Sequence, residues 1–134
     1  MDSDKTAPHA RVNATKLRLK NEFELHGGVA WVTKGREIEN YIDHTRLHRA
    51  VKSVYGDAYG SSQPGSPFDH ALHFRRNTPR RRRKGSPPPD LIKRDVDKVK
   101  VSRAVVDDGS RDLDVLDLRD RVSEVVKMIN RANT

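Results

Sequence analysis

A long stretch without hydrophobic periodicity, residues 57–90, limits what this 134-residue chain can fold into. Glycine, serine, proline and arginine dominate it, and RRNTPRRRRKGSPPP lies near its end. Such a composition buries too little apolar surface to order a chain, so we expect a disordered basic loop here. Only residues 1–56 and 91–134 then remain to build a core. With 34% hydrophobic residues, we expect them to form one domain at most.

Capping residues followed by apolar residues at helical spacing predict four helices outside this loop. The last helix is the most strongly indicated, because its apolar residues recur at intervals of four, three and four: Leu118, Val122, Val125 and Ile129. The expected caps and helical ranges are Asn13 with 14–26, Asp43 with 44–56, Asp95 with 96–106 and Asp117 with 116–133.

The fold class is predicted from the order of the elements. The apolar run VAWVT, residues 29–33, is typical of a buried strand. Asp2 and Asp4 stand at i and i+2, so on a strand end their side chains point the same way. Strand, helix, strand and helix in this order predict an α/β fold with a parallel sheet. Two strands are too few for a stable sheet, so we expect further strands upstream of residue 1.

The positive charge is concentrated in one part of the chain. Residues 75–103 hold twelve Arg and Lys against three Asp, a net +9, while the whole chain carries +8. Such a cluster binds nucleic-acid phosphates without sequence preference, although a solvated loop is the simpler interpretation. The candidate nucleic-acid-binding residues are Arg80, Arg81, Arg82, Arg83 and Lys84.

Several classes of protein are excluded by what the sequence lacks. It contains no cysteine, which rules out a disulfide framework and a thiolate metal site. No apolar run approaches the length of a membrane helix, and the acidic start does not look like a signal peptide. We therefore expect a cytoplasmic protein without membrane contact. His44 and His48, at i and i+4, could hold a metal ion, but no third ligand is indicated.

The motifs follow one another in an order that resembles a known family. DSDK is followed by a polar loop, by N-x-T-K at the start of a helix, and by WVTKGREIENYI. This order resembles the second half of a TOPRIM domain, in particular that of the OLD-family (overcoming lysogenization defect) endonucleases. The resemblance covers residues 1–56 and about 90–134. It implies a partial, Rossmann-like TOPRIM domain with a short remnant of a parallel sheet and C-terminal helices.

The resemblance also implies a function and a set of site residues. Members of the family join an ABC-type ATPase domain to a TOPRIM nuclease domain that cleaves DNA with divalent metal ions. Asp2 and Asp4 match the metal-binding D-x-D motif, for Mg²⁺ or Mn²⁺. Lys98, with Lys100 as the alternative, matches the catalytic lysine, which would stabilise charge on the phosphate. Glu37 and Glu39 would lie close to the metal, or would simply stabilise a helix N-terminus.

The chain departs from the family pattern in one respect, because the acidic residues of the domain's first strand have no counterpart here. We therefore expect a fragment of an ATP-dependent endonuclease, either the tail of a longer protein or a gene remnant, and we expect it to be inactive in isolation. The alternative is a small, basic nucleic-acid-binding protein without catalysis. DNA is the expected partner in both cases, and an upstream ATPase domain is a further expected partner in the first.

Overall fold

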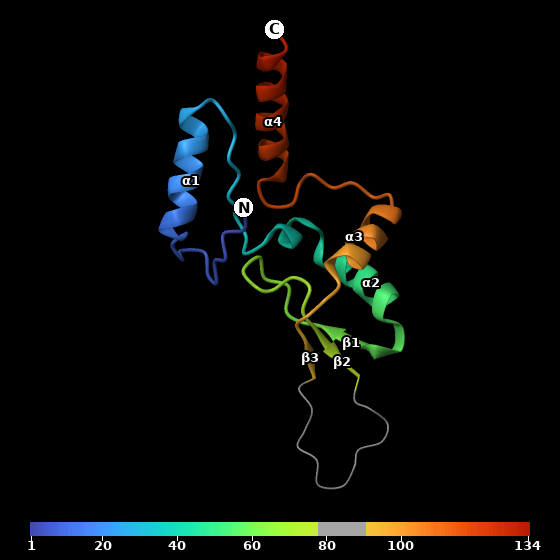
Figure 1. The fold of residues 1–134 in the computed structure, drawn as a ribbon. Coiled ribbons are helices and arrows are strands. Elements are labelled where there is room, and N and C mark those ends of the chain that lie inside the picture. The colour runs from blue at the N-terminus through green and yellow to red at the C-terminus, as the bar shows by residue number, and fades with distance from the viewer. Residues whose placement is uncertain (78–90) are drawn as a thin grey trace. The chain divides into compact units, whose positions relative to one another are not determined.

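The computed structural model describes residues 1–77 and 91–134, which form two compact units (Figure 1). The first unit comprises residues 1–43, 66–70 and 111–134. The second comprises residues 44–65 and the described parts of 71–110. Each unit has its own buried residues. The α/β prediction is therefore confirmed at the level of mixed helix and sheet.

The first unit contains α1 (Ala14–Leu25), the 3₁₀ helix η1 (Ile38–Tyr41) and α4 (Leu118–Ala132). Helix α1 begins where predicted, because the Asn13 side chain accepts a hydrogen bond of 2.8 Å from the Thr15 backbone nitrogen. The chain leaves this helix through Gly27, which has a φ of 79° that glycine tolerates best. Both ends of this helix were thus determined by local chemistry.

Helix α4 also forms as predicted, but its apolar stripe is not buried in the described structure. Val122, Val125 and Ile129 keep 39%, 37% and 48% of their surface exposed. Asp117 occupies the N-cap position, yet its side chain makes no capping hydrogen bond. With 15 residues α4 is the longest described helix, and no helix within residues 1–77 and 91–134 is long and apolar enough to cross a membrane.

The second unit combines two α-helices with a small sheet. Its elements are α2 (His44–Tyr55), the 3₁₀ helix η2 (Gly56–Ala58), β1 (Tyr59–Ser62), β2 (Phe74–Arg76), β3 (Ile92–Lys93) and α3 (Lys98–Asp107). Helices α2 and α3 pack side by side (Figure 1). The three strands form one antiparallel sheet in the order β1-β2-β3.

Phe74 forms the centre of the core of this unit. It is fully buried, and its ring centroid lies 4.9 Å from that of Tyr55 and 5.1 Å from that of Tyr59. Such aromatic contacts add to the free energy of burying the rings. The other side chains with almost no exposed surface come from α2 and α3, and they are Leu47, Val51 and Val101.

The sheet corrects the prediction of a parallel remnant near the D-x-D motif. It is antiparallel and is built from β1, β2 and β3, whereas residues 29–33 form no strand. The reason is that the chain returns after β1, so that β2 pairs with it in the antiparallel sense. Part of the loop expected over residues 57–90 is therefore ordered as β1 and β2. The glycine and serines of β1 gave no alternating pattern that would have indicated a strand.

The start of α3 also differs from the prediction. Asp97 caps this helix by accepting a hydrogen bond of 3.0 Å from the Lys100 backbone nitrogen. Asp95, the predicted cap, instead forms an ion pair of 2.9 Å with Lys93 on β3. Both aspartates have the right chemistry for a cap, and the pairing of β3 in the sheet decided between them.

His48 makes the second unit sensitive to pH. Burial, together with the neighbouring His44, lowers the pKa of His48 below its ordinary value. Its Nε2 lies 3.0 Å from the Ala71 carbonyl oxygen, to which it can only donate, so in the neutral ring Nδ1 accepts from the Tyr59 hydroxyl at 3.0 Å. The unfolded chain binds the proton more readily than the folded unit. Protonation of His48 therefore does not reduce the free energy of unfolding above about pH 6.5. As the pH drops below this value, that free energy falls.

We expect the stability of His48→Gln to depend less on pH, because glutamine is uncharged between pH 5.5 and 7.5. Guanidinium unfolding, followed by circular dichroism at these two pH values, measures the change in stability. The exposed His26 lies on the first unit, so His26→Gln serves as the control and should leave the dependence of the second unit unchanged. A dependence that is equally steep in His48→Gln would contradict this assignment.

Candidate functional site

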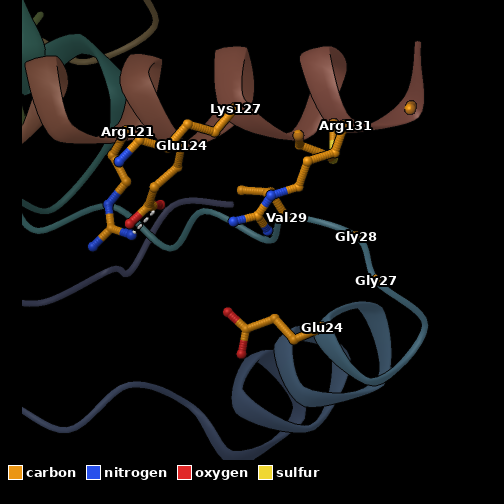
Figure 2. Close-up of a pocket in the computed structure, with 10 residues that line it drawn as sticks. Glu24, Gly27, Gly28, Val29, Arg121, Glu124, Lys127 and Arg131 are labelled. Atoms are coloured by element: carbon orange, nitrogen blue, oxygen red, sulfur yellow. Dashed lines mark hydrogen bonds and ion pairs between the residues drawn. The ribbon is translucent and has the colours of Figure 1, made fainter. Parts of the chain in front are cut away.

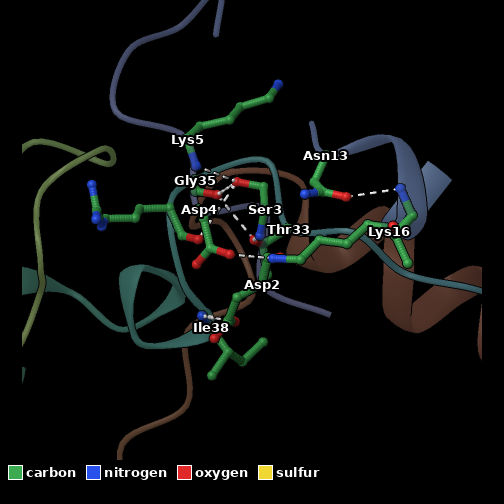
Figure 3. A network of polar contacts seen from close by, with 11 residues as sticks. Asp2, Ser3, Asp4, Lys5, Asn13, Lys16, Thr33, Gly35 and Ile38 are labelled. Atoms are coloured by element: carbon green, nitrogen blue, oxygen red, sulfur yellow. Dashed lines mark hydrogen bonds and ion pairs between the residues drawn. The ribbon is translucent and has the colours of Figure 1, made fainter. Parts of the chain in front are cut away.

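Ser3 anchors the D-x-D segment to the WVTKGREIENYI segment. It is buried, its backbone nitrogen donates to Thr33 Oγ1 at 2.8 Å, and its Oγ donates to the Gly35 carbonyl oxygen at 2.5 Å (Figure 3). The next residue continues the contact, since the Asp4 backbone nitrogen donates to the Arg36 carbonyl oxygen at 2.9 Å. Two motifs that lie about 30 residues apart in the sequence therefore meet in the first unit.

The hydrogen bonds at the start of this segment are of the parallel type. The Met1 nitrogen donates to the Trp31 carbonyl oxygen at 2.7 Å, and the Thr33 nitrogen donates back to the Met1 carbonyl oxygen at 3.0 Å. These two bonds are too few to define a strand. They nevertheless place Ser3 inward and leave the flanking aspartates on the outer side, as the alternation of an extended chain requires.

Asp2 contacts the beginning of η1. Its Oδ1 accepts a hydrogen bond of 2.8 Å from the Ile38 backbone nitrogen. Glu37 is the N-cap of this short helix and exchanges hydrogen bonds with Asn40 in a capping box. Glu39 lies in the first turn. The structure therefore brings Asp2 to the segment that carries both predicted glutamates, at a helix N-terminus that favours negative charge.

Asp4 pairs with Lys16 from α1. The Lys16 ammonium group contacts the Asp4 carboxylate, and it also donates to the Asp2 carbonyl oxygen at 2.7 Å (Figure 3). The hydrogen bond from Lys16 to the Asp4 carboxylate lowers the pKa of the Asp4 carboxyl group. The side chain of Asp4 is 68% exposed and that of Lys16 is 25% exposed, so the pair lies at the surface with its amine partly covered. Asp4 has a φ of 56°, which ends the extended segment.

Lys16 was not assigned a role by the sequence. The one sequence feature that could have drawn attention to Lys16 was its place in the N-x-T-K motif, three residues after the cap of α1. Because Asn13 starts the helix there, Lys16 falls in its first turn and projects toward the D-x-D segment (Figure 3). Local capping chemistry thus sets the position of the amine, although only the fold reveals its partner.

A polar cluster around Tyr41 holds the WVTKGREIENYI segment in place. The Tyr41 hydroxyl donates to Asp117 Oδ1 at 2.5 Å and accepts from the Lys34 backbone nitrogen at 2.8 Å. Its ring meets Trp31 edge to face, with the centroids 4.9 Å apart. Burial and the carboxylate of Asp117 raise the pKa of Tyr41. Burial acts to raise the pKa of Asp117 as well, but hydrogen bonds from Tyr41 and Arg121 outweigh it and lower that pKa.

The remaining predicted residues lie elsewhere or have other partners. Lys98 is the first residue of α3, in the second unit, whereas Asp2 and Asp4 belong to the first. Lys100 pairs with Asp97 at 3.4 Å. Glu37 lies 3.5 Å from His70 Nδ1. The basic run of Arg80, Arg81, Arg82, Arg83 and Lys84 lies outside the described residues.

A separate cavity of about 660 Å³ opens between the end of α1 and the face of α4 (Figure 2). Glu24, Gly27 and Gly28 line one side, and Glu124, Lys127 and Arg131 lie on the other. Arg121 also reaches it but is engaged by Glu124 at 2.8 Å. Of the residues predicted for the nuclease site, none that the structure describes lines this cavity.

The D-x-D segment offers few oxygen ligands for a metal ion among the described residues. In residues 1–77 and 91–134 no group of three or more His, Asp or Glu side chains is arranged to hold a metal ion. Mg²⁺, however, is commonly held by one or two carboxylates while water and phosphate oxygens complete its shell. The Lys16 ammonium already places a positive charge between oxygens of Asp2 and Asp4. One carboxylate and one carbonyl oxygen therefore meet at this position, and Lys16 contacts both.

Comparisons with protein-family models, with curated proteins and with solved structures find no match to this chain. The resemblance of its motifs to the OLD-family nucleases thus stays a prediction.

Proposed function

We propose that the first unit supplies the D-x-D part of a metal-dependent DNA nuclease centre of the OLD and TOPRIM type. The observation that supports it is the set of hydrogen bonds from Ser3 to Thr33 and Gly35. These bonds bring together two of the motifs that carry the resemblance, DSDK and WVTKGREIENYI. They also leave the carboxylates of Asp2 and Asp4 on the side that faces Lys16 and the start of η1.

In this proposal the residues of the chain have distinct roles. Asp2 and Asp4 hold one Mg²⁺ or Mn²⁺ ion, which when bound activates water and neutralises charge on a phosphodiester. The hydrogen bond from Ile38 orients Asp2, and Ser3 keeps the segment from moving. By resemblance, Lys98 and an upstream ATPase domain belong to the same proposal, with Glu37 and Glu39 close to the ion. The run from Arg80 to Lys84, proposed from its charge, would help to hold the DNA backbone.

The test is Mn²⁺ binding, followed by the loss of the electron paramagnetic resonance signal of the free ion. We expect the 134-residue chain to bind Mn²⁺ at millimolar concentration or below, and Asp4→Asn to weaken binding by about tenfold or more, because it removes a charged ligand. Asp120→Asn is the matched control, since it removes an exposed carboxylate from the first turn of α4. Equal binding by Asp4→Asn and the unmodified chain would refute the proposed site.

A second candidate function, nucleic-acid binding without catalysis, is favoured by the sheet of the second unit. Strands β2 and β3 are neighbours, with Phe74 opposite Lys93 and Arg75 opposite Ile92. They bring together cationic residues from the two sides of the basic run: Arg75, Arg76, Lys93 and Arg94. Such a surface would bind phosphates in a manner that weakens steeply with salt.

Anisotropy of a labelled DNA duplex at constant ionic strength separates the two candidates. The nuclease proposal expects Mg²⁺ to strengthen binding by the unmodified chain and not by Asp4→Asn, because the ion would bridge the carboxylates and a phosphate. Binding that is the same with Mg²⁺ and with chelator, in both proteins, and that fades with salt would favour the second candidate.

A further inference from the structure

The cavity between the end of α1 and the face of α4 has the size of a ligand site. Its volume of about 660 Å³ falls in the range of roughly 300–1,000 Å³ that holds small organic molecules in proteins. Lys127 and Arg131 project from its α4 wall, and Gly27 and Gly28 lie on the opposite wall (Figure 2). A Cβ added at Gly27 would meet no atom within 4 Å, so the space beside it is open. All of these residues belong to the first unit.

Lys127 and Arg131 give this cavity an excess of positive charge. Within residues 1–77 and 91–134, neither side chain forms a hydrogen bond or an ion pair with another residue. They lie four residues apart on one helix, a spacing at which like charges repel and cost stability. The two carboxylates of the lining already have cationic partners. Glu24 pairs with Lys20 at 2.6 Å, and Glu124 pairs with Arg121 at 2.8 Å.

The helix ends beside the cavity do not cancel this excess. The C-terminal ends of α1 and α4 each carry a negative charge of about half an elementary charge, against the two full charges of Lys127 and Arg131. The carbonyl oxygens at the end of α1 also have partners, because the Gly27 and Gly28 nitrogens donate to Glu24 and Phe23 at 3.1 and 3.0 Å. A net positive charge therefore remains at the cavity.

We propose that this cavity binds a phosphate monoester carried on an aromatic ring, as in a nucleoside monophosphate. A phosphate monoester carries nearly two negative charges at neutral pH, which matches the two cations. The Arg131 guanidinium offers parallel N–H donors to two phosphate oxygens, and Lys127 adds a second charge on a flexible stem. Met128 also lines the cavity, and its thioether favours contact with an aromatic ring. This inference goes beyond the proposed nuclease centre, because it concerns other residues.

Titration of the isotope-labelled 134-residue chain, followed by the NMR signals of its amides, tests the proposal. The probes are adenosine monophosphate, adenosine and inorganic phosphate. We expect adenosine monophosphate to shift the amides of Gly27, Gly28 and residues 127–132, and each of its two parts to bind at least about fivefold more weakly. Adenosine monophosphate that shifts only amides of the second unit, or none, would overturn the proposed site.

Three variants separate this cavity from positive charge elsewhere on the chain. We expect Lys127→Met to bind adenosine monophosphate about tenfold more weakly than the unmodified chain. Lys52→Met is the matched control, since Lys52 is an exposed cation in the last turn of α2, in the second unit, and its affinity should stay within about twofold. Equal affinities for these two variants would overturn the proposal.

The third variant, Arg131→Lys, keeps the charge at the end of α4 and removes only the planar pair of donors. We expect it to weaken the binding of adenosine monophosphate about fivefold. A role of Arg131 in stabilising the helix end alone would leave that affinity unchanged, and this outcome would contradict the assignment of the phosphate to Arg131.

A tetranucleotide without a terminal phosphate distinguishes a phosphate monoester from the backbone of a nucleic acid. Its phosphodiesters carry one charge each, so we expect it to shift the amides of residues 127–132 less than adenosine monophosphate does at the same concentration. Equal or tighter binding of the tetranucleotide through these amides would overturn the assignment to a phosphate monoester.

Discussion

Replacing Phe74 with alanine is expected to lower the free energy of unfolding of the second unit by about 3–5 kcal/mol. Its ring has no exposed surface and lies against Tyr55 and Tyr59, so truncation removes the burial of a whole ring and leaves a cavity. Small domains have a total stability of only about 5–15 kcal/mol. The unit should therefore be largely destabilised by this one change.

Hydrogen–deuterium exchange measures the effect of Phe74→Ala in each unit separately. Amides of α2 and α3 should exchange much faster, because both helices pack over the same core. Val106→Ala is the control, since Val106 on α3 is 73% exposed and contributes little to the core. Unchanged protection of α2 in Phe74→Ala would show that the core is not centred on this ring.

Replacing Gly35 with alanine is expected to destabilise the first unit by about 1–3 kcal/mol, through overpacking. An added Cβ would lie 2.7 Å from the Pro67 carbonyl oxygen, 3.1 Å from Asn40 Cβ and 3.2 Å from Leu116 Cδ1. The Pro67 oxygen cannot easily move, because it accepts a hydrogen bond of 2.7 Å from the Arg36 nitrogen. The backbone at residue 35 must shift instead.

That shift has a consequence for the candidate site. The Gly35 carbonyl oxygen accepts the hydrogen bonds of Ser3 Oγ and of Thr33 Oγ1. Moving it should release the D-x-D segment, and Mn²⁺ binding should weaken together with stability. Fluorescence of Trp31, the single tryptophan of the chain, reports unfolding of this unit in guanidinium.

Lys34→Ala is the control for Gly35→Ala. The Lys34 side chain is exposed, and the hydrogen bond that it makes to Tyr41 comes from its backbone nitrogen, which alanine keeps. We expect its unfolding midpoint to match that of the unmodified chain. If Gly35→Ala also matched it, the close packing around Gly35 would be disproved.

The helices could be predicted because their signals are local. Asn13 and Gly27 bound α1 through a side-chain cap and a positive φ, and the spacing of Leu118, Val122 and Val125 is sufficient for α4. Each signal acts within a few residues, so no knowledge of the rest of the fold is needed. The cap of α3 was predicted wrongly, since Asp97 caps this helix while Asp95 pairs with Lys93 on β3.

The sheet and the candidate site depended on contacts between distant residues. Nothing local in YGSS indicates a strand, and β1 forms because β2 provides its partner and Phe74 its core. The sequence predicted that Asp2 and Asp4 act as a pair, which stays a prediction. It did not predict that Lys16 meets them, because an ion pair across twelve residues depends on how α1 is oriented.

What the sequence determined by itself was therefore the four α-helices, with their limits except at the start of α3, the concentration of positive charge, and the motifs worth examining. Only the tertiary structure decided which strands pair, that the apolar stripe of α4 stays exposed among the described residues, and that Lys16 closes onto the D-x-D segment. The physical reason is the range of the interactions. Caps and helical spacing act within one turn, whereas strand pairing, burial and ion pairing are settled only when distant segments come together.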